Sequence, residues 1–138
     1  MATSSDLTHD RDGAAPVMSG TPLVVDIAGK FSAFTEHWAP KIVARYNDNE
    51  VRLVKTLGEW VWHKHDETDE PFNILEREFD MDFRDHAVTV RPGEILVVPR
   101  GGEHRPAARR GEDMLILIDP NGTPNSGDPA TATKAVEL

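Results

Sequence analysis

Short apolar runs separated by turn residues fill the middle of the chain, and this alternation limits the possible folds more than any other feature. The runs at residues 42–46 and 51–56 flank Asn47-Asp48-Asn49-Glu50, which is a strong hairpin signal. Further runs lie at residues 72–75, 79–83, 88–90, 95–98 and 114–118. Many short strands with frequent turns predict an all-β fold, either an antiparallel barrel or a sandwich.

The two ends of the chain differ in composition from this middle part. Residues 1–20 are small and polar and contain several glycines and prolines, so we expect a disordered tail there. Residues 126–138 predict a flexible C-terminal tail. One barrel domain is therefore expected over residues 21–125, within a chain of 138 residues that is long enough for a real core.

A short helix is expected before the strands. Asp26 is a candidate N-cap, and Pro40 would end the helix. The apolar residues at helical spacing between them are Ile27, Phe31, Phe34 and Trp38. We interpret this aromatic stripe as a lid over the core, and direct contact with a ligand is the alternative.

Charge and composition disfavour several classes of protein. The formal net charge is −9, which is a poor match for nucleic acid or an anionic membrane. The absence of cysteine excludes disulfides, thiolate metal sites and cysteine nucleophiles. No apolar run approaches the length of a membrane span, and the first residues lack the pattern of a signal peptide. We therefore expect a cytoplasmic protein that acts on small molecules.

Three histidines and one glutamate form the strongest functional signal. His63 and His65 lie two residues apart, so both rings would project from one face of a strand. Glu70 adds a charged oxygen, and His104 arrives from a distant segment. Such a set can hold one divalent ion and leave coordination positions open. The sequence contains no nucleophile motif and no phosphate-binding or dinucleotide-binding glycine motif, so any chemistry is expected to run through the metal.

Two motifs carry a family resemblance. Residues 58–70, GEWVWHKHDETDE, contain a glycine, then His-x-His, then Glu, and residues 93–104, GEILVVPRGGEH, read G-x5-P-x-G-x2-H. Together they resemble the paired motifs of the small single-domain cupins of the cupin-2, RmlC-like type. The resemblance implies a double-stranded β-helix, the jelly-roll barrel, and a homodimer. It also implies that the ligands of the metal are His63, His65, Glu70 and His104.

The resemblance implies one divalent metal ion but not its identity, so Fe, Zn, Ni and Mn all stay open. A Lewis-acid metal would support an isomerase, dehydratase or cyclase, whereas iron that activates dioxygen would support a dioxygenase. The alternative is a non-catalytic protein that binds or senses a small molecule.

Strand alternation predicts the side chains that surround the metal. Phe72 and Ile74 lie an even number of residues from Glu70, so on a strand they would face the same side as that ligand. Val61 would face the same side as His63 and His65 for the same reason. Lys55 has the parity of the apolar residues 51 and 53, so it would either contact an anionic substrate or lie at the rim beside a local acid.

The remaining charged and aromatic residues are expected on the outside. Trp60 and Trp62 would face outward and need cover from the helix or from a second subunit. The acidic residues between positions 66 and 85 would form the solvated face of strands, since they lack the spacing of a calcium loop. Surface charges are expected at Arg100, Arg105, Arg109 and Arg110. For Arg100 the alternative is contact with an anionic ligand.

Overall fold

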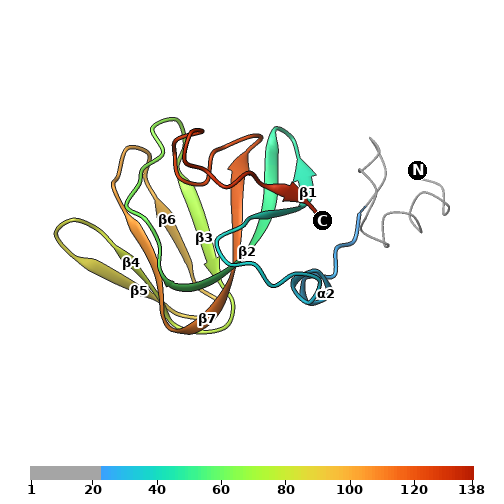
Figure 1. Ribbon diagram of the computed structural model, residues 1–138, viewed down its shortest axis with the longest axis horizontal. Coiled ribbons are helices and arrows are strands. Elements are labelled where there is room, and N and C mark those ends of the chain that lie inside the picture. The colour runs from blue at the N-terminus through green and yellow to red at the C-terminus, as the bar shows by residue number, and fades with distance from the viewer. Residues whose placement is uncertain (1–22) are drawn as a thin grey trace.

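The computed structural model describes residues 23–138, so the predicted disordered tail at residues 1–20 lies outside the described residues. The secondary structure comprises α2 (Ile27–Phe31), β1 (Lys41–Tyr46), β2 (Asn49–Glu59), β3 (Glu70–Ile74), β4 (Phe79–Asp82), β5 (Ala87–Val90), β6 (Ile95–Val98), β7 (Arg105–Pro120) and β8 (Val136–Glu137). The prediction of an all-β barrel with a short N-terminal helix is confirmed, as Figure 1 shows.

The long strand β7 organises the sheet. The strand order is β5-β4-β7-β2-β1-β8, and β3 pairs with both β6 and β7. The first part of β7 pairs with β4, and its last part pairs with β3, while β2 runs antiparallel to it on the other edge. Gly111 separates the two parts, and its φ of 117° is a conformation that residues with a Cβ rarely adopt. Strand β7 therefore spans the barrel from end to end.

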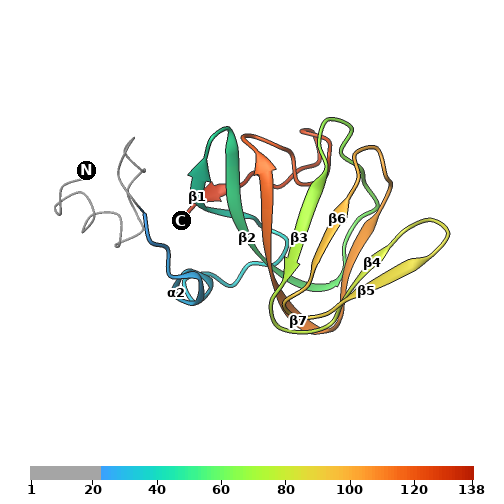
Figure 2. The same cartoon turned by 180° about the vertical axis from the view of Figure 1, so that it is seen from behind.

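Two apolar clusters stabilise the fold, one on each side of the sheet. The cluster inside the barrel includes Val54, Phe72 and Leu115. The second cluster lies under α2 and includes Phe31 and Leu53. Figures 1 and 2 show α2 beside β1 and β2, at the opposite end of the molecule from the β4–β5 hairpin. As a result, β2 is buried on both faces.

The helix begins where the sequence predicts but ends earlier. Asp26 is the N-cap, and its Oδ1 accepts a hydrogen bond from the backbone N–H of Gly29 at 3.1 Å. The helix ends at Phe31 and does not continue to Pro40, so that part of the prediction is wrong. The following segment runs beside β2, where the N–H of Trp38 donates to the carbonyl of Lys55 at 2.8 Å. Pairing with a strand replaces further helical turns here.

The C-terminal residues contact the barrel. Val136 and Glu137 form β8, which pairs parallel to β1, and the N–H of Leu138 donates to the carbonyl of Ile42 at 3.0 Å. The side chain of Ser126 is buried and hydrogen-bonds to Thr131. The flexibility of residues 126–138 stays a prediction, but Ser126 and residues 136–138 have defined partners.

Part of the predicted solvated acidic face is buried, which corrects that prediction. Asp80 and Asp82 are each 7% exposed on β4. Arg109 donates to both carboxylates and to that of Glu59, and Arg105 also pairs with Asp82. These hydrogen bonds lower the pKa of Asp82, because the neighbouring guanidinium groups favour its charged form. The arginines of β7 are thus partners of buried acids rather than free surface charges.

Candidate metal centre

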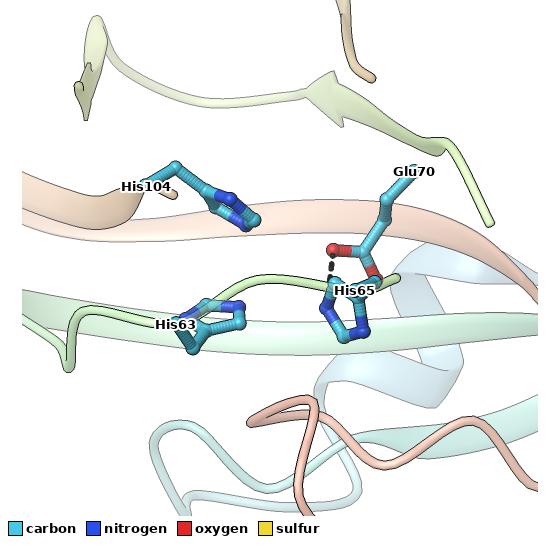
Figure 3. A group of neighbouring side chains, drawn as sticks. All are labelled: His63, His65, Glu70 and His104. Atoms are coloured by element: carbon cyan, nitrogen blue, oxygen red, sulfur yellow. Dashed lines mark ion pairs between the residues drawn. The ribbon is translucent and has the colours of Figure 1, made fainter. Parts of the chain in front are cut away.

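The four predicted ligands come from three segments that meet at one end of the barrel. His63 and His65 lie in the irregular segment between β2 and β3, Glu70 is the first residue of β3, and His104 directly precedes β7. All four side chains are buried. Figure 3 shows their polar ends turned toward a common centre.

The segment that carries His63 and His65 is not the regular strand that their spacing predicts. Only His63 takes part in β-pairing, through an isolated antiparallel bridge to His104. The N–H of His63 donates to the carbonyl of His104 at 3.0 Å, and the reciprocal bond is 2.9 Å long. This backbone bridge brings the two ligands together although they are far apart in sequence.

Backbone carbonyls orient two of the imidazole rings. The Nδ1 of His63 lies 3.0 Å from the carbonyl of Val61, and the Nδ1 of His104 lies 2.8 Å from that of Gly102. A carbonyl can only accept, so each Nδ1 carries the proton and each Nε2 keeps its lone pair. The same second-sphere contact to a carbonyl is usual for histidines that bind metals.

The structure tests whether these residues fit an ion. The Nε2 atoms of His65 and His104 are buried and have no hydrogen-bond partner among residues 23–138. One ligand atom from each of the four residues lies within 4.8 Å of all the others. The Nε2 of His65 lies 3.3 Å from Oε1 of Glu70, which is the dashed contact in Figure 3. Orphaned lone pairs beside a carboxylate are the donors that a divalent cation requires, so the residues fit.

Burial also sets the protonation of the ligands. It lowers the pKa of His63 to about 4, and it lowers the pKa of His65 and of His104 as well. Burial raises the pKa of Glu70. At neutral pH the three rings are therefore neutral, which is the form that binds a metal.

A cavity of about 30 Å³ lies beside His63 and Glu70 and has room for about two water molecules. Its walls are mostly apolar, and its polar lining residues include Arg52 and Asp119. The apolar lining includes Trp38, Trp60, Phe72, Leu115 and Leu117. The barrel thus places a small, largely apolar cavity beside His63 and Glu70.

Two stacked tryptophans form one wall of this cavity. The rings of Trp38 and Trp60 stack with centroids 5.5 Å apart, and the ring of Trp60 contacts that of His63 edge-on at 5.0 Å. The backbone of Trp38 has a φ of 58°, which is uncommon for a residue with a Cβ. Trp60 therefore lies beside the site rather than outside the barrel, which corrects its predicted direction. Trp62 instead packs against Arg84, whose guanidinium carbon lies 4.0 Å from the centroid of the Trp62 ring.

The predicted pocket residues fall into different places. Phe72 lines the cavity, and Ile74 is fully buried in the barrel core but does not line it. Val61 is 48% exposed, because the irregular segment around it does not alternate like a strand. Lys55 points to the outer cluster, where its Nζ donates to the carbonyl of Phe34 at 2.6 Å. The pocket prediction is thus corrected for Lys55, Val61 and Ile74, and Phe72 is the one of the four that lines the cavity.

The structure adds two charged residues that the sequence reasoning missed. Arg52 is 1% exposed and donates to Glu50 through Nε at 2.9 Å and Nη2 at 2.6 Å. Asp119 is also 1% exposed, and burial together with the charge of Glu70 raises the pKa of Asp119 to about 9. A signal for Arg52 was present, because a lone arginine inside an apolar strand points to a buried charge with a partner. Arg100, by contrast, pairs with Asp69 at the surface.

Comparisons with known proteins agree with this geometry. No protein-family model matches the chain. A crystal structure of a cupin-2 domain containing protein from Shewanella frigidimarina is 42% identical, with a TM-score of 0.69, over 71% of this chain and 95% of that one. Protein NMB1881 from Neisseria meningitidis is 32% identical, with a TM-score of 0.64, over 71% of this chain and 99% of that one.

A curated relative matches over a shorter stretch. The uncharacterized protein YdbB of Bacillus subtilis is 39% identical over 64 residues, which are 46% of this chain. The match spans 57% of that relative's own length. Within residues 23–138 no helix is long and apolar enough to cross a membrane.

Proposed function

This chain belongs to the cupin-2 domain family, and we propose that it is a mononuclear metal-binding protein that acts on a small molecule. The ligands of one divalent ion, Fe, Zn, Ni or Mn, would be His63, His65, Glu70 and His104. The observation that carries the proposal is the pair of buried Nε2 atoms, on His65 and His104, that have no hydrogen-bond partner among the described residues. Buried polar atoms are rarely left unpaired without a reason, and a bound cation supplies one.

Three neutral imidazoles and one carboxylate would leave a divalent ion with a net positive charge, which suits an anionic or carbonyl oxygen. Such an ion supplies Lewis acidity for isomerisation, dehydration or cyclisation, or, as iron, a site for dioxygen chemistry. The chain's own residues supply the rest. The apolar wall that includes Trp60 and Phe72 keeps bulk water away, and Glu70 holds its charge next to the ion.

Elemental analysis tests the proposal first. The protein is purified without added metal or a metal-binding tag, and oxygen uptake is then followed with a panel of carbonyl acids and sugars. We expect about one equivalent of a divalent metal per chain. Iron with substrate-dependent oxygen uptake would identify a dioxygenase, and another metal without uptake would favour Lewis-acid chemistry. A folded protein that takes up no metal would overturn the proposal.

A second candidate is a non-catalytic protein that binds or senses a small molecule through the same metal. Exchange of the metal separates the two functions. A catalytic site should lose turnover when a chelator removes the metal, whereas a structural metal should resist chelation and its removal should unfold the chain.

The homodimer and the location in the cytoplasm also stay proposals, and they rest on the family resemblance and the composition. Sedimentation equilibrium of the full chain across a hundredfold range of concentration tests the first. A single species of monomer mass at every concentration would rule the dimer out.

A further inference from the structure

A buried carboxyl group lies in the cavity without an N–H donor. Asp119 is near the end of β7, on the same face as Leu115 and Leu117, and is 1% exposed. Among residues 23–138 no N–H group donates a hydrogen bond to either of its side-chain oxygens. Its polar neighbour is the carboxyl group of Glu70, whose charge and hydrogen bond raise the pKa of Asp119. A buried carboxyl group with no N–H donor and another acid beside it destabilises the fold, so its presence calls for an explanation.

The nearest cation does not satisfy this carboxyl group. The Nη1 of Arg52 lies 3.6 Å from Oδ2 of Asp119, which is beyond hydrogen-bond distance. Arg52 directs its hydrogen bonds elsewhere, to Glu50 and to the carbonyl of Thr123 at 2.9 Å. Glu50 therefore neutralises the guanidinium, and the polar group that contacts Asp119 is the carboxyl group of Glu70.

The position of Asp119 puts it within reach of a ligand. Asp119 lines the same cavity as His63 and Glu70, so a molecule held at the metal would meet its carboxyl group. The other walls beside it are apolar side chains such as Phe72 and Leu117, which offer no hydrogen bond. The cavity thus has two polar subsites, the metal centre and Asp119, joined by apolar surface.

We propose that Asp119 forms a hydrogen bond with a hydroxyl group of the small molecule that occupies this cavity. The inference rests on the proposed function, because it requires an ion held by the four ligands. A hydroxyl group both donates and accepts, so it suits a carboxyl group whether or not that group is protonated. The metal centre favours an anionic or carbonyl oxygen, and the narrow cavity favours few carbons. The substrate class is therefore a short molecule that carries a hydroxyl group next to a carboxylate or carbonyl group.

Binding of two probes to the cobalt-loaded full chain tests this proposal. Glycolate carries the hydroxyl group, and methoxyacetate replaces its hydrogen with methyl but keeps the carboxylate. Dissociation constants are read from the visible absorption of cobalt. In the unchanged protein we expect glycolate to bind more tightly than methoxyacetate. In Asp119→Leu the ratio of the methoxyacetate constant to the glycolate constant should fall about tenfold, which is the usual effect of losing one buried hydrogen bond.

Two further variants make the result specific. Asp119→Asn keeps a group that can hydrogen-bond, so the ratio of the two dissociation constants should fall less in this variant than in Asp119→Leu. Asp113→Asn is the matched control, because Asp113 is buried on the same face of β7 but does not line the cavity. Its ratio should equal that of the unchanged protein.

The possible failures are distinguishable. An unchanged ratio in both Asp119 variants would overturn the role of Asp119 and leave the proposed function standing. Loss of cobalt binding in Asp119→Leu would assign the residue to the metal site and overturn its role toward the ligand. Failure of the unchanged protein to bind cobalt would remove the proposed function itself, and this inference with it.

Discussion

Asp113 and Asp119 lie on one face of β7, with Leu115 and Leu117 between them, and both are almost completely buried. At one end, Oδ1 of Asp113 accepts hydrogen bonds from the backbone N–H groups of Glu76, Arg77 and Met114 at 2.8–3.1 Å. At the other end, neither oxygen of Asp119 has an N–H donor among the described residues. The first carboxyl group stabilises a turn, and the second lies beside Glu70 without an N–H donor.

The difference between these two ends of the barrel shows how burial alone fails to identify function. Both aspartates have a raised pKa, and burial is the largest cause in each case. The count of donors separates them: Oδ1 of Asp113 accepts three hydrogen bonds although its Oδ2 accepts none, whereas neither oxygen of Asp119 has an N–H donor among the described residues. Removing the carboxyl group of Asp113 should therefore lower the free energy of unfolding, whereas removing that of Asp119 should raise it.

Asp113→Ala should give the largest effect on stability. It leaves three backbone N–H groups near Glu76 without an acceptor, and we expect the free energy of unfolding to fall by about 3 kcal/mol. Denaturation in urea measures this value. The metal content of the folded variant should stay at that of the unchanged protein, because Asp113 is not among the grouped ligands. If the free energy of unfolding falls by less than about 1 kcal/mol, the structural role assigned to Asp113 is wrong.

His104→Ala should give the largest effect at the other end. It removes a ligand, so we expect the affinity for the metal to fall at least about 100-fold, more than is usual for a second-sphere change. The apolar clusters supply most of the stability, so the variant should keep a folded barrel. Elemental analysis and circular dichroism measure the two quantities. Global unfolding of the variant would mean that the metal is structural and that this end, too, holds the fold together.

Asp119→Asn should have a smaller effect of opposite sign. The neutral amide removes a buried carboxyl group that has no N–H donor, so the free energy of unfolding of the metal-free protein at pH 7 should rise by about 1 kcal/mol. The same urea titration measures it. A loss of stability as large as that expected for Asp113→Ala would show that the two aspartates have the same role.

Asp82→Asn should give the smallest effect and extends the comparison to an acid paired with arginines. Arg109 and Arg105 lower the pKa of Asp82, so its stabilising contribution is present above the unfolded pKa of about 3.9 and is lost as the pH falls through the lower folded value. We expect the variant to lose about 0.5 kcal/mol at pH 7. The difference should vanish in the most acidic buffers in which the protein stays folded. A difference that persists there would exclude the ion pair as its cause.

The sequence was sufficient for the features that depend on local chemistry. The hairpin at Asn47-Asp48 is confirmed, with Tyr46 opposite Asn49, because turn residues act within a few positions. The barrel class and the family resemblance are also confirmed. The four predicted ligands lie together in the structure, since their motif spacing carries the geometry of the site.

The features that failed depend on tertiary contacts. The alternation of side chains along β2 does not show which of its faces lies inside the barrel. Leu53 and Lys55 face the cluster under α2, whereas Arg52 and Val54 face the cavity. Both faces are buried, so the pattern of apolar residues carries no direction.

Asp119 was hidden in a similar way. The predicted apolar run stops at residue 118, and Pro120 and Asn121-Gly122 are turn residues, yet β7 continues through Pro120 and carries Asp119 into the cavity. Pairing with Glu50 and Asn49 of β2 extends the strand against the local turn signal. Only the fold reveals which partners a polar residue lacks.

The reciprocal backbone bonds between His63 and His104 have a consequence for how the protein would acquire the proposed metal. They close a long loop of chain during folding, so the entropy of loop closure is already spent before an ion arrives. Metal uptake would then restrict only side-chain rotamers. Such a preorganised site would exchange its ion without unfolding, so the empty protein would stay folded and its occupancy would follow the concentration of metal.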